Sequence, residues 1–268
     1  PPGLFGGIRV TTAGICLLSI LRLAGGRILP EPGTWRGLFV VGTLLFVGGN
    51  GLITLAERTV DSGLAAILVA TVPLWMALME SMTPGGERLR WIGWLGQFLG
   101  VGGVCLLFSS RIGSGHGNLS GIWLVMASAF CWSLGSFLQR RLSHGRSPYG
   151  QAGWHMVLGG VTMTLIGLLL GETIDQENLT RNAIAAFFYL LIVGSLLGFV
   201  AYVWLLLHVG TPIAGTYAYV NPILAVALGV AWDGEKIGTA MVAGLGVILA
   251  GVSLVRSGRV VAPASKSP

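Results

Sequence analysis

Two amide side chains lie inside apolar stretches, where lipid can offer them no hydrogen-bond partner. Asn221 lies in "YVNPILAVALGV" and Asn50 lies in "FVGGNGLIT". An amide carries N–H donors and a carbonyl acceptor, and burying such groups unpaired is costly. Each amide could therefore bond to a neighbouring helix or contact a small bound molecule, and the sequence leaves both interpretations open.

Aromatic side chains are concentrated in the second half of the chain and extend the set of candidate contacts. At the ends of membrane spans such residues form an interfacial belt, which is the interpretation preferred for Trp154. Tyr217 and Tyr219 lie nearer the middle of a span, and side chains two positions apart do not share a helix face. Tyr217 is preferred because it lies one turn from Asn221. The predicted substrate path comprises Asn50, Thr71, Trp75, Trp132, His155, Tyr202, Tyr217 and Asn221.

Few charged or titratable side chains lie inside the apolar stretches. Arg9 and His155 fall at the same depth when the two halves of the chain are aligned, so they could bind an anionic group or take part in proton coupling. Arg9 could instead extend its side chain toward the membrane surface. Glu80 is interpreted as interfacial, and Glu87 as a charge at the N-terminus of the next helix.

Two prolines interrupt apolar runs that otherwise predict helix. Pro73 and Pro222 each remove a backbone N–H and clash with the preceding turn. The carbonyls left without donors, at Val69 and Ala218, should face protein or a watery cavity, because lipid cannot satisfy them. Each proline is either a fixed structural kink or a hinge, and their matching positions in the two halves favour the hinge.

No constellation typical of catalysis or metal binding is present in the sequence. The four histidines are dispersed and lack metal-ligand spacing. Neither a nucleophile-elbow motif nor a phosphate-binding loop occurs. The three cysteines, Cys16, Cys105 and Cys131, lie in apolar stretches, as small buried hydrophobic residues do. We therefore expect no enzyme activity, no cofactor and no metal.

The elements that must position these residues are membrane-spanning helices. Of the 268 residues, 53% are hydrophobic and only 10% are charged, against about 25% charged in soluble domains, so the composition indicates a polytopic membrane protein. A span needs about 20 apolar residues. The predicted spans are residues 4–24, 35–55, 62–82, 89–109, 119–139, 150–171, 183–207, 210–231 and 237–256.

The basic residues are scattered over short loops, so the net charge of +6 concerns membrane topology and does not predict nucleic-acid binding. Alternate loops fall on two sides, and the side with most of the arginines is predicted to be cytoplasmic. The C-terminus is then cytoplasmic, and we expect a multi-pass protein of the cell (inner) membrane. The expected partners are the lipid bilayer and a small-molecule substrate, and a homodimer is left open.

The second half of the chain repeats the first. With Pro73 aligned to Pro222, "GERLRWIGW" falls on "GEKIGTAMV". The second copy begins with an extra span whose counterpart would precede residue 1, so we expect a five-plus-five design whose first helix is missing from this sequence. The predicted domains are a first repeat at 1–110, a second repeat at 118–257 and a polar tail at 258–268. Five spans in each copy invert the second copy in the membrane, which is typical of transporters.

The paired units of proline, apolar run, Gly-Glu, base and glycine-rich helix resemble the EamA-type members of the drug/metabolite transporter superfamily. "CWSLGSFLQRR" is similar to the opening helix of a repeat, and "GGIRV" is similar to the start of the second helix. The resemblance implies an all-α membrane fold of ten helices and the movement of small metabolites or amino acids. The chain departs from this pattern in its missing first helix and in "TVPLW", where the second copy has "YVNPI".

We therefore predict a secondary transporter that moves small metabolites or amino acids, in the direction of export, by alternating access. A non-transporting membrane assembly protein is the alternative, because glycine-rich packing alone permits it. A membrane-embedded enzyme would need a nucleophile or a metal site that the sequence lacks. A nucleotide-sugar-type carrier ranks low, since no lysine lies inside a span.

Overall fold

The structure is a computed structural model that describes residues 2–60, 62–107, 119–142, 147–174, 180–221, 223–224 and 239–260. Pro222, one of the two predicted hinge residues, lies outside the described residues, and so do residues 261–268 of the predicted tail.

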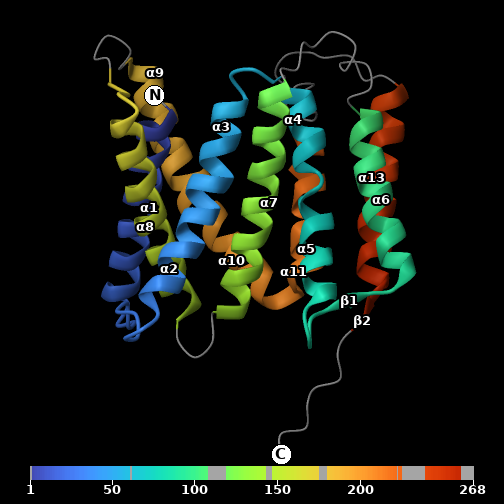
Figure 1. The fold of residues 1–268 in the computed structure, drawn as a ribbon, viewed down its shortest axis with the longest axis horizontal. Coiled ribbons are helices and arrows are strands. Elements are labelled where there is room, and N and C mark those ends of the chain that lie inside the picture. Colours follow the sequence, from blue (N-terminus) through green and yellow to red (C-terminus); the bar gives the residue numbers. More distant parts are fainter. Residues whose placement is uncertain are drawn as a thin grey trace, which may run out of the picture. The chain divides into compact units, whose positions relative to one another are not determined.

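Most described residues lie in helices (Figure 1). The elements up to residue 107 are α1 (Pro2–Leu23), α2 (Trp35–Gly42), the π-helix η1 (Thr43–Gly51), α3 (Leu52–Ala56), α4 (Ser62–Val69), α5 (Val72–Met82), β1 (Arg88–Leu89) and α6 (Trp91–Leu107). The later elements are α7 (Leu119–Leu142), α8 (Pro148–Leu169), α9 (Arg181–Tyr189), the π-helix η3 (Leu190–Leu197), α10 (Gly198–Val209), α11 (Thr211–Gly215), α13 (Thr239–Ser257) and β2 (Arg259–Val260).

Six helical stretches in the described part of the chain are long and apolar enough to cross a membrane. They are Pro2–Leu23, Trp35–Ala56, Leu64–Met82, Leu119–Leu142, Pro148–Leu169 and Arg181–Val209. Two further apolar helices, Trp91–Leu107 and Val242–Ser257, are shorter. Because a span needs about 20 apolar residues, these helices confirm the prediction of a mostly helical, multi-pass membrane protein. The count of nine spans and the inverted repeat stay predictions.

The chain forms two compact units, and each unit is built from both halves of the sequence. The first unit holds Pro1–Leu55 and Leu134–His208, and the second unit holds Ala56–Ser133 and Val209–Pro268. Helix α7 contributes residues to both units. The spatial units therefore do not coincide with the two predicted repeats, because each unit takes helices from both of them.

In the first unit, α1 and α8 lie side by side (Figure 1). Glycines permit this approach: a Cβ at Gly14 would lie 2.8 Å from the carbonyl oxygen of Gly153, and a Cβ at Gly7 would lie 2.6 Å from the backbone nitrogen of Thr164. Small residues let membrane helices pack closely. Helices η1 and α2 also contact α8, and η3 contacts α1.

Gly171 ends α8 and turns the chain back toward the start of α1. Its φ of 76° is left-handed, a conformation that glycine adopts without a Cβ clash. The N–H of Glu172 donates to the carbonyl of Gly167 at 2.9 Å, as in a Schellman motif. The Glu172 carboxylate in turn accepts hydrogen bonds from the N–H groups of Gly3 (3.2 Å) and Leu4 (2.9 Å). A carboxylate at this position satisfies the first free donors of α1 and interacts favourably with its dipole.

In the second unit, α6 and α13 pack through glycines in the same way. A Cβ at Gly96 would lie 2.5 Å from the carbonyl oxygen of Gly251, and a Cβ at Gly103 would lie 2.8 Å from the backbone nitrogen of Ile248. Strands β1 and β2 pair antiparallel and join the segment before α6 to the segment after α13. One buried hydrophobic cluster of this unit consists of Ala70, Val104, Leu107, Tyr219 and Ile248.

Candidate functional site

The apolar stretch that contains Pro73 is broken in the structure. Helix α4 ends at Val69, and α5 begins at Val72 with Pro73 as its second residue. Between them, Thr71 donates from its N–H (3.1 Å) and from its hydroxyl (2.7 Å) to the carbonyl of Leu68. The hydroxyl of Thr71 thus gives the Leu68 carbonyl a side-chain donor at the break, whereas the carbonyl that Pro73 deprives of a helical donor is that of Val69. The sequence predicted an interruption here, and the structure confirms it.

A second break with the same local geometry occurs at Thr216, where α11 ends. The N–H and hydroxyl of Thr216 both donate to the carbonyl of Ile213, at 3.0 and 2.7 Å. The carbonyl of Thr216 accepts from the N–H of Tyr219 at 3.0 Å. Sequence reasoning missed this break, because it looked for a proline and found Pro222, six residues later. The threonine is no specific signal, because Thr43 also follows a glycine inside an apolar run and the helix continues there.

The two breaks pack directly against each other within the second unit. A Cβ at Gly215 would lie 3.0 Å from Cα of Pro73 and 2.8 Å from Sδ of Met76. No side chain therefore separates the end of α11 from the start of α5. Interrupted helices that meet inside a membrane protein bring polar backbone groups to a depth where lipid has none, and such backbone is tolerated only beside protein or a cavity.

Side chains from two other helices bond to the backbone at the first break. The hydroxyl of Ser133 lies 3.2 Å from the carbonyl oxygen of Val72, and Nε2 of Gln97 donates to the carbonyl of Pro73 at 3.3 Å. Tyr219 donates to Oε1 of Gln97 at 2.9 Å. These three side chains are fully buried. They hold the break in place, so Tyr219 has a packing role, in keeping with the preference for Tyr217 in the predicted path.

Trp75 brings an unused donor close to the break. Its indole Nε1 is buried and has no hydrogen-bond partner, and its ring packs edge-on against Phe130, with centroids 5.3 Å apart. A buried polar group without a partner is costly. Such a donor can serve a ligand or a water molecule. Of the other second-unit candidates, Trp132 and Tyr217 are half-buried and Asn221 is exposed.

The first unit holds the remaining predicted site residues. Asn50 lies in η1, half-buried, and its carbonyl accepts from the hydroxyl of Thr54 at 2.8 Å. Tyr202 of α10 is buried and donates to the hydroxyl of Ser136 at 2.6 Å. Two π-helical segments, η1 and η3, interrupt α-helical stretches here, and π-helical turns occur frequently at functional sites.

Arg9 and His155 also lie in the first unit, on α1 and α8. The imidazole of His155 is only 2% exposed, and its Nδ1 has no hydrogen-bond partner in the described residues. The Nε of Arg9 is likewise buried without a partner. The face of α1 that packs against α8 includes Gly7, Thr11 and Gly14, and Arg9, two residues from Thr11, lies on a different face of the helix.

Glu80 lies near the end of α5, where it was predicted to be interfacial, and its depth in the membrane stays a prediction. What the structure adds is burial within the protein, because Glu80 is 1% exposed. Its Oε1 accepts from the hydroxyl of Thr211 at 2.7 Å, and its Oε2 accepts from the N–H of Glu87 at 3.2 Å. The side chain therefore ties the end of α5 to the start of α11 and to the loop before α6. Only these contacts, which are distant in sequence, could have revealed its burial.

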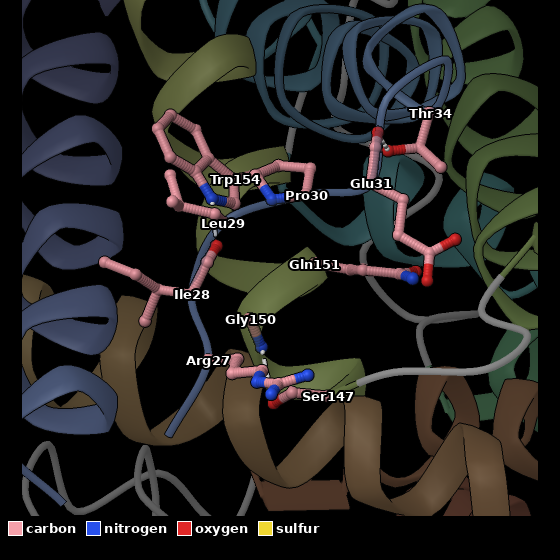
Figure 2. A pocket seen from close by; sticks show the side chains of 10 residues that line it. All are labelled: Arg27, Ile28, Leu29, Pro30, Glu31, Thr34, Ser147, Gly150, Gln151 and Trp154. Carbon is pink, nitrogen blue, oxygen red and sulfur yellow. Dashed lines mark hydrogen bonds between the residues drawn. The ribbon is translucent and has the colours of Figure 1, made fainter. Parts of the chain in front are cut away.

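Figure 2 shows a small pocket in the first unit, where the loop after α1 meets the start of α8. The indole of Trp154 donates to the carbonyl of Ile28 at 2.7 Å on its wall. The pocket has a volume of about 40 Å³, far below the roughly 300–1,000 Å³ of small-molecule sites. None of the predicted path residues lines it, so it is no substitute for the predicted path.

In the part of the chain that the structure describes, no group of three or more His, Cys, Asp or Glu side chains is placed to hold a metal ion. The three cysteines are free thiols.

Known proteins resemble the chain over nearly its whole length. A model of the EamA-like transporter family matches residues 1–109 and 119–257. The chain is 35% identical to the uncharacterized inner membrane transporter YedA of Escherichia coli K12, and the match covers 98% of this chain and 84% of YedA.

More distant relatives extend the comparison. The uncharacterized transporter YdfC of Bacillus subtilis is 27% identical over 77% of this chain and 66% of its own length. The uncharacterized transporter YoaV of Bacillus subtilis is 22% identical over 94% of this chain and 86% of its own length. A protein of known crystal structure superimposes with a TM-score of 0.79 at 22% identity, over 95% of this chain and 86% of that one. At that identity the superposition shows a shared fold.

Proposed function

Because the chain belongs to the EamA-like transporter family, we propose that it moves a small metabolite or amino acid across the inner membrane by alternating access. Export is the proposed direction, with the C-terminus in the cytoplasm. Its family and the names of its relatives point to transport rather than to enzyme catalysis.

The observation that carries this proposal is the meeting of two helix breaks at Pro73 and Gly215 in the second unit. A continuous helix is stiff, whereas a broken one can change the angle between its halves with few lost hydrogen bonds. Transporters commonly place substrate and coupling-ion sites at discontinuous helices near the middle of the membrane. We assign the pivoting role to Thr71, Pro73 and Thr216, with Pro222 as a further hinge.

The contact pattern supports the proposed inverted repeat. In the numbering of that repeat, α1 corresponds to α8, α6 corresponds to α13, and the stretch with η1 corresponds to the stretch with η3. Four of the observed pairs are α1 with α8, α6 with α13, α8 with η1 and α1 with η3. When each helix in these pairs is replaced by its counterpart in the other copy, the same four pairs result. That is what an exchange of conformations between two copies requires in alternating access.

Each unit holds some of the residues proposed for the substrate path. The first unit holds Asn50, His155 and Tyr202, and the second unit holds Thr71, Trp75, Trp132, Tyr217 and Asn221. Trp75 has the strongest support among them, since its indole donor is buried without a partner.

The test is counterflow in liposomes with the full chain and a panel of unlabelled amino acids and small metabolites. Gly215→Ala pushes a Cβ into Pro73 and Met76, and overpacking costs about 1–3 kcal/mol. If that strain acts on one of two conformations, their ratio changes by about 5–150-fold, and counterflow falls accordingly. Gly102→Ala is the matched control, because nothing lies within 4 Å of its Cβ.

Both variants must elute as folded protein at the wild-type position in size-exclusion chromatography before their fluxes are compared. Absence of counterflow by folded wild-type protein with every member of the panel would count against transport and favour a membrane assembly protein. Equal flux in Gly215→Ala and Gly102→Ala would be compatible with transport, but it would refute the pivoting role of the two breaks.

A further inference from the structure

We propose that the second unit binds the headgroup of an anionic phospholipid at the end where α6 begins and α13 ends. The binding surface is the arginine group, which consists of Arg88, Arg90, Arg256 and Arg259. The partner is a component of the membrane and not the transported solute, so the proposal goes beyond the proposed function and does not depend on it.

A short antiparallel ladder collects three of these arginines from distant parts of the chain (Figure 1). Leu89 of β1 pairs with Arg259 of β2, and Arg88 and Arg90 flank Leu89. One step along the ladder, the N–H of Arg90 donates to the carbonyl of Gly258 at 2.8 Å. Paired Cα atoms of antiparallel strands lie about 4.5–5.5 Å apart, so the backbone holds these arginines as close neighbours.

Arg256 joins the group because the end of α13 packs against the first turn of α6. A Cβ at Gly258 would contact the backbone nitrogen of Gly93, and a Cβ at Gly93 would lie 3.4 Å from Cα of Gly258. Arg256 lies two residues before Gly258, so its Cα is within about 13 Å of that of Arg90. A phosphate between them can lie within one Debye length, about 10 Å at 0.1 M salt, of the whole arginine group.

The charges of this group are not compensated within the described part of the chain. Arg88, Arg90 and Arg256 are exposed, and their guanidinium groups form no hydrogen bond or ion pair with the described residues. The carboxylate of Glu87, the residue before Arg88, is directed elsewhere, because a Cβ at Gly210 would contact both of its oxygens. Since gathered like charges repel one another, an anion from outside the chain is attracted to this surface.

The arginines at the end of α7 show that a basic helix end does not by itself produce such a surface. Arg140 and Arg141 lie in the last turn of that helix. The guanidinium of Arg141 lies over the ring of Phe137, 4.8 Å from its centroid, and neither arginine is without a partner. Those arginines are used within the protein, whereas the exposed members of the arginine group are available to a partner.

The arginine group lies at the level where two apolar helices end. Helix α6 begins at Trp91, directly after Arg90, and α13 ends at Ser257, directly after Arg256. Trp91 is 71% exposed, and tryptophans at the ends of apolar helices lie at the level of the lipid headgroups. Arginines just beyond this level meet the phosphates of the bilayer surface.

An exposed apolar face continues from the arginine group along α6. Leu95 and Phe98 follow Trp91 by four and seven residues, so the three exposed side chains share one face of the helix. Gly102, four residues further on, has nothing within 4 Å of its Cβ. A headgroup bound by the arginines therefore lies at the end of a surface along which acyl chains can pack, which favours a phospholipid over a free phosphate ion.

The chemistry of the arginine group selects an anionic headgroup over a zwitterionic one. A guanidinium binds phosphate through two parallel N–H···O bonds, and each basic residue near an anionic membrane surface adds about fivefold in affinity. A zwitterionic headgroup carries its own cation beside the phosphate, and the arginines repel that cation. The expected partner is therefore a lipid whose headgroup has a net negative charge.

The experiment measures thermal unfolding of the purified full chain in dodecyl maltoside with added phosphatidylglycerol, or with phosphatidylcholine that has the same acyl chains. We expect phosphatidylglycerol to raise the Tm by about 2–4 °C more than phosphatidylcholine does. This difference should disappear in about 1 M NaCl, where the Debye length is about 3 Å. Glycerol 3-phosphate, which offers the phosphate without acyl chains, should give no rise.

Two single variants form a matched pair, because Arg256→Gln and Arg22→Gln each remove an exposed arginine from the last turn of an apolar helix. Arg256→Gln should reduce the Tm rise specific to phosphatidylglycerol by at least half, and Arg22→Gln should keep the full rise. The double variant Arg88→Gln/Arg90→Gln should abolish it. All variants should have the wild-type Tm in phosphatidylcholine, which verifies that they are folded.

The proposal is overturned if the two lipids raise the Tm equally. It is also overturned if Arg256→Gln and Arg22→Gln reduce the response alike, since diffuse surface charge would then explain it. A rise with glycerol 3-phosphate that Arg256→Gln abolishes would assign the site to a soluble anion instead. A lipid response without counterflow would preserve this site and refute transport, and counterflow without lipid selectivity would do the reverse.

Discussion

Gly100 of α6 lies against the aromatic ring of Tyr219. A Cβ at position 100 would lie 2.5 Å from Cε2 and 2.6 Å from Cζ of that ring. The missing side chain lets the ring come close enough for its hydroxyl to reach Gln97 at 2.9 Å. Because Gln97 also donates to the carbonyl of Pro73, this glycine helps to hold the first helix break.

Gly100→Ala should therefore destabilise the protein. The added methyl group must displace a buried ring, and overpacking of this kind costs about 1–3 kcal/mol. Thermal unfolding in detergent measures the effect as a lowered Tm. Gly102→Ala, two residues along the same helix and with open space around its Cβ, should change the Tm little. Equal Tm values for the two variants would refute the packing described for Tyr219.

Thr211→Val should lower stability by removing the hydroxyl that donates to Glu80. Loss of a donor to a buried charged group costs about 1–3 kcal/mol, and Glu80 is 1% exposed. Thr12→Val is the matched control, because the hydroxyl of Thr12 only returns to the carbonyl of Ile8 on its own helix. A Tm for Thr211→Val as high as that of Thr12→Val would mean that the carboxylate of Glu80 does not depend on this bond.

Two tryptophans should respond in opposite ways to replacement by phenylalanine. Trp154→Phe removes an indole donor that bonds to the carbonyl of Ile28 at 2.7 Å, so the Tm should fall by an amount equivalent to about 1 kcal/mol. Trp75→Phe removes a buried donor with no partner and should leave the Tm unchanged or raised.

Counterflow distinguishes the two tryptophans by function as well. If the indole of Trp75 serves the solute, Trp75→Phe should reduce flux despite its intact stability. Full flux in Trp75→Phe, measured alongside Trp154→Phe, would exclude the Trp75 donor from the substrate path.

Tyr202 and Ser136 should show an energetic coupling in a double-mutant cycle. Their hydroxyls are 2.6 Å apart and both side chains are buried. Unfolding free energies of Tyr202→Phe, Ser136→Ala and the double variant should reveal a coupling of about 0.5–1.5 kcal/mol. Additive effects would show that this hydrogen bond contributes no net stability.

The sequence by itself determined the features that depend on local chemistry. Apolar runs about as long as a bilayer is thick have few alternatives to membrane helices, because lipid satisfies no backbone group. Pro73 lacks an N–H wherever it lies in the fold, so the break beside it was predictable. The end of α8 at Gly171 follows from the same kind of local rule.

Only the tertiary structure decided which polar side chains are buried and what they contact. The position of Glu80 in the sequence indicates an interfacial residue. The structure shows in addition that its carboxylate is buried, because Thr211, 131 residues later in the chain, packs against it. Tyr217 and Tyr219 carry the same side chain. Tyr219 is buried in the core because Gly100 has no Cβ and leaves room for its ring.

The break at Thr216 likewise needed the structure, since threonine is compatible with an unbroken helix and no proline marks the position. Its meeting with the break at Pro73 is a contact between segments far apart in the chain. Hydropathy and spacing report what each residue prefers on its own, whereas the partner that satisfies a buried polar group is set by which helices pack together.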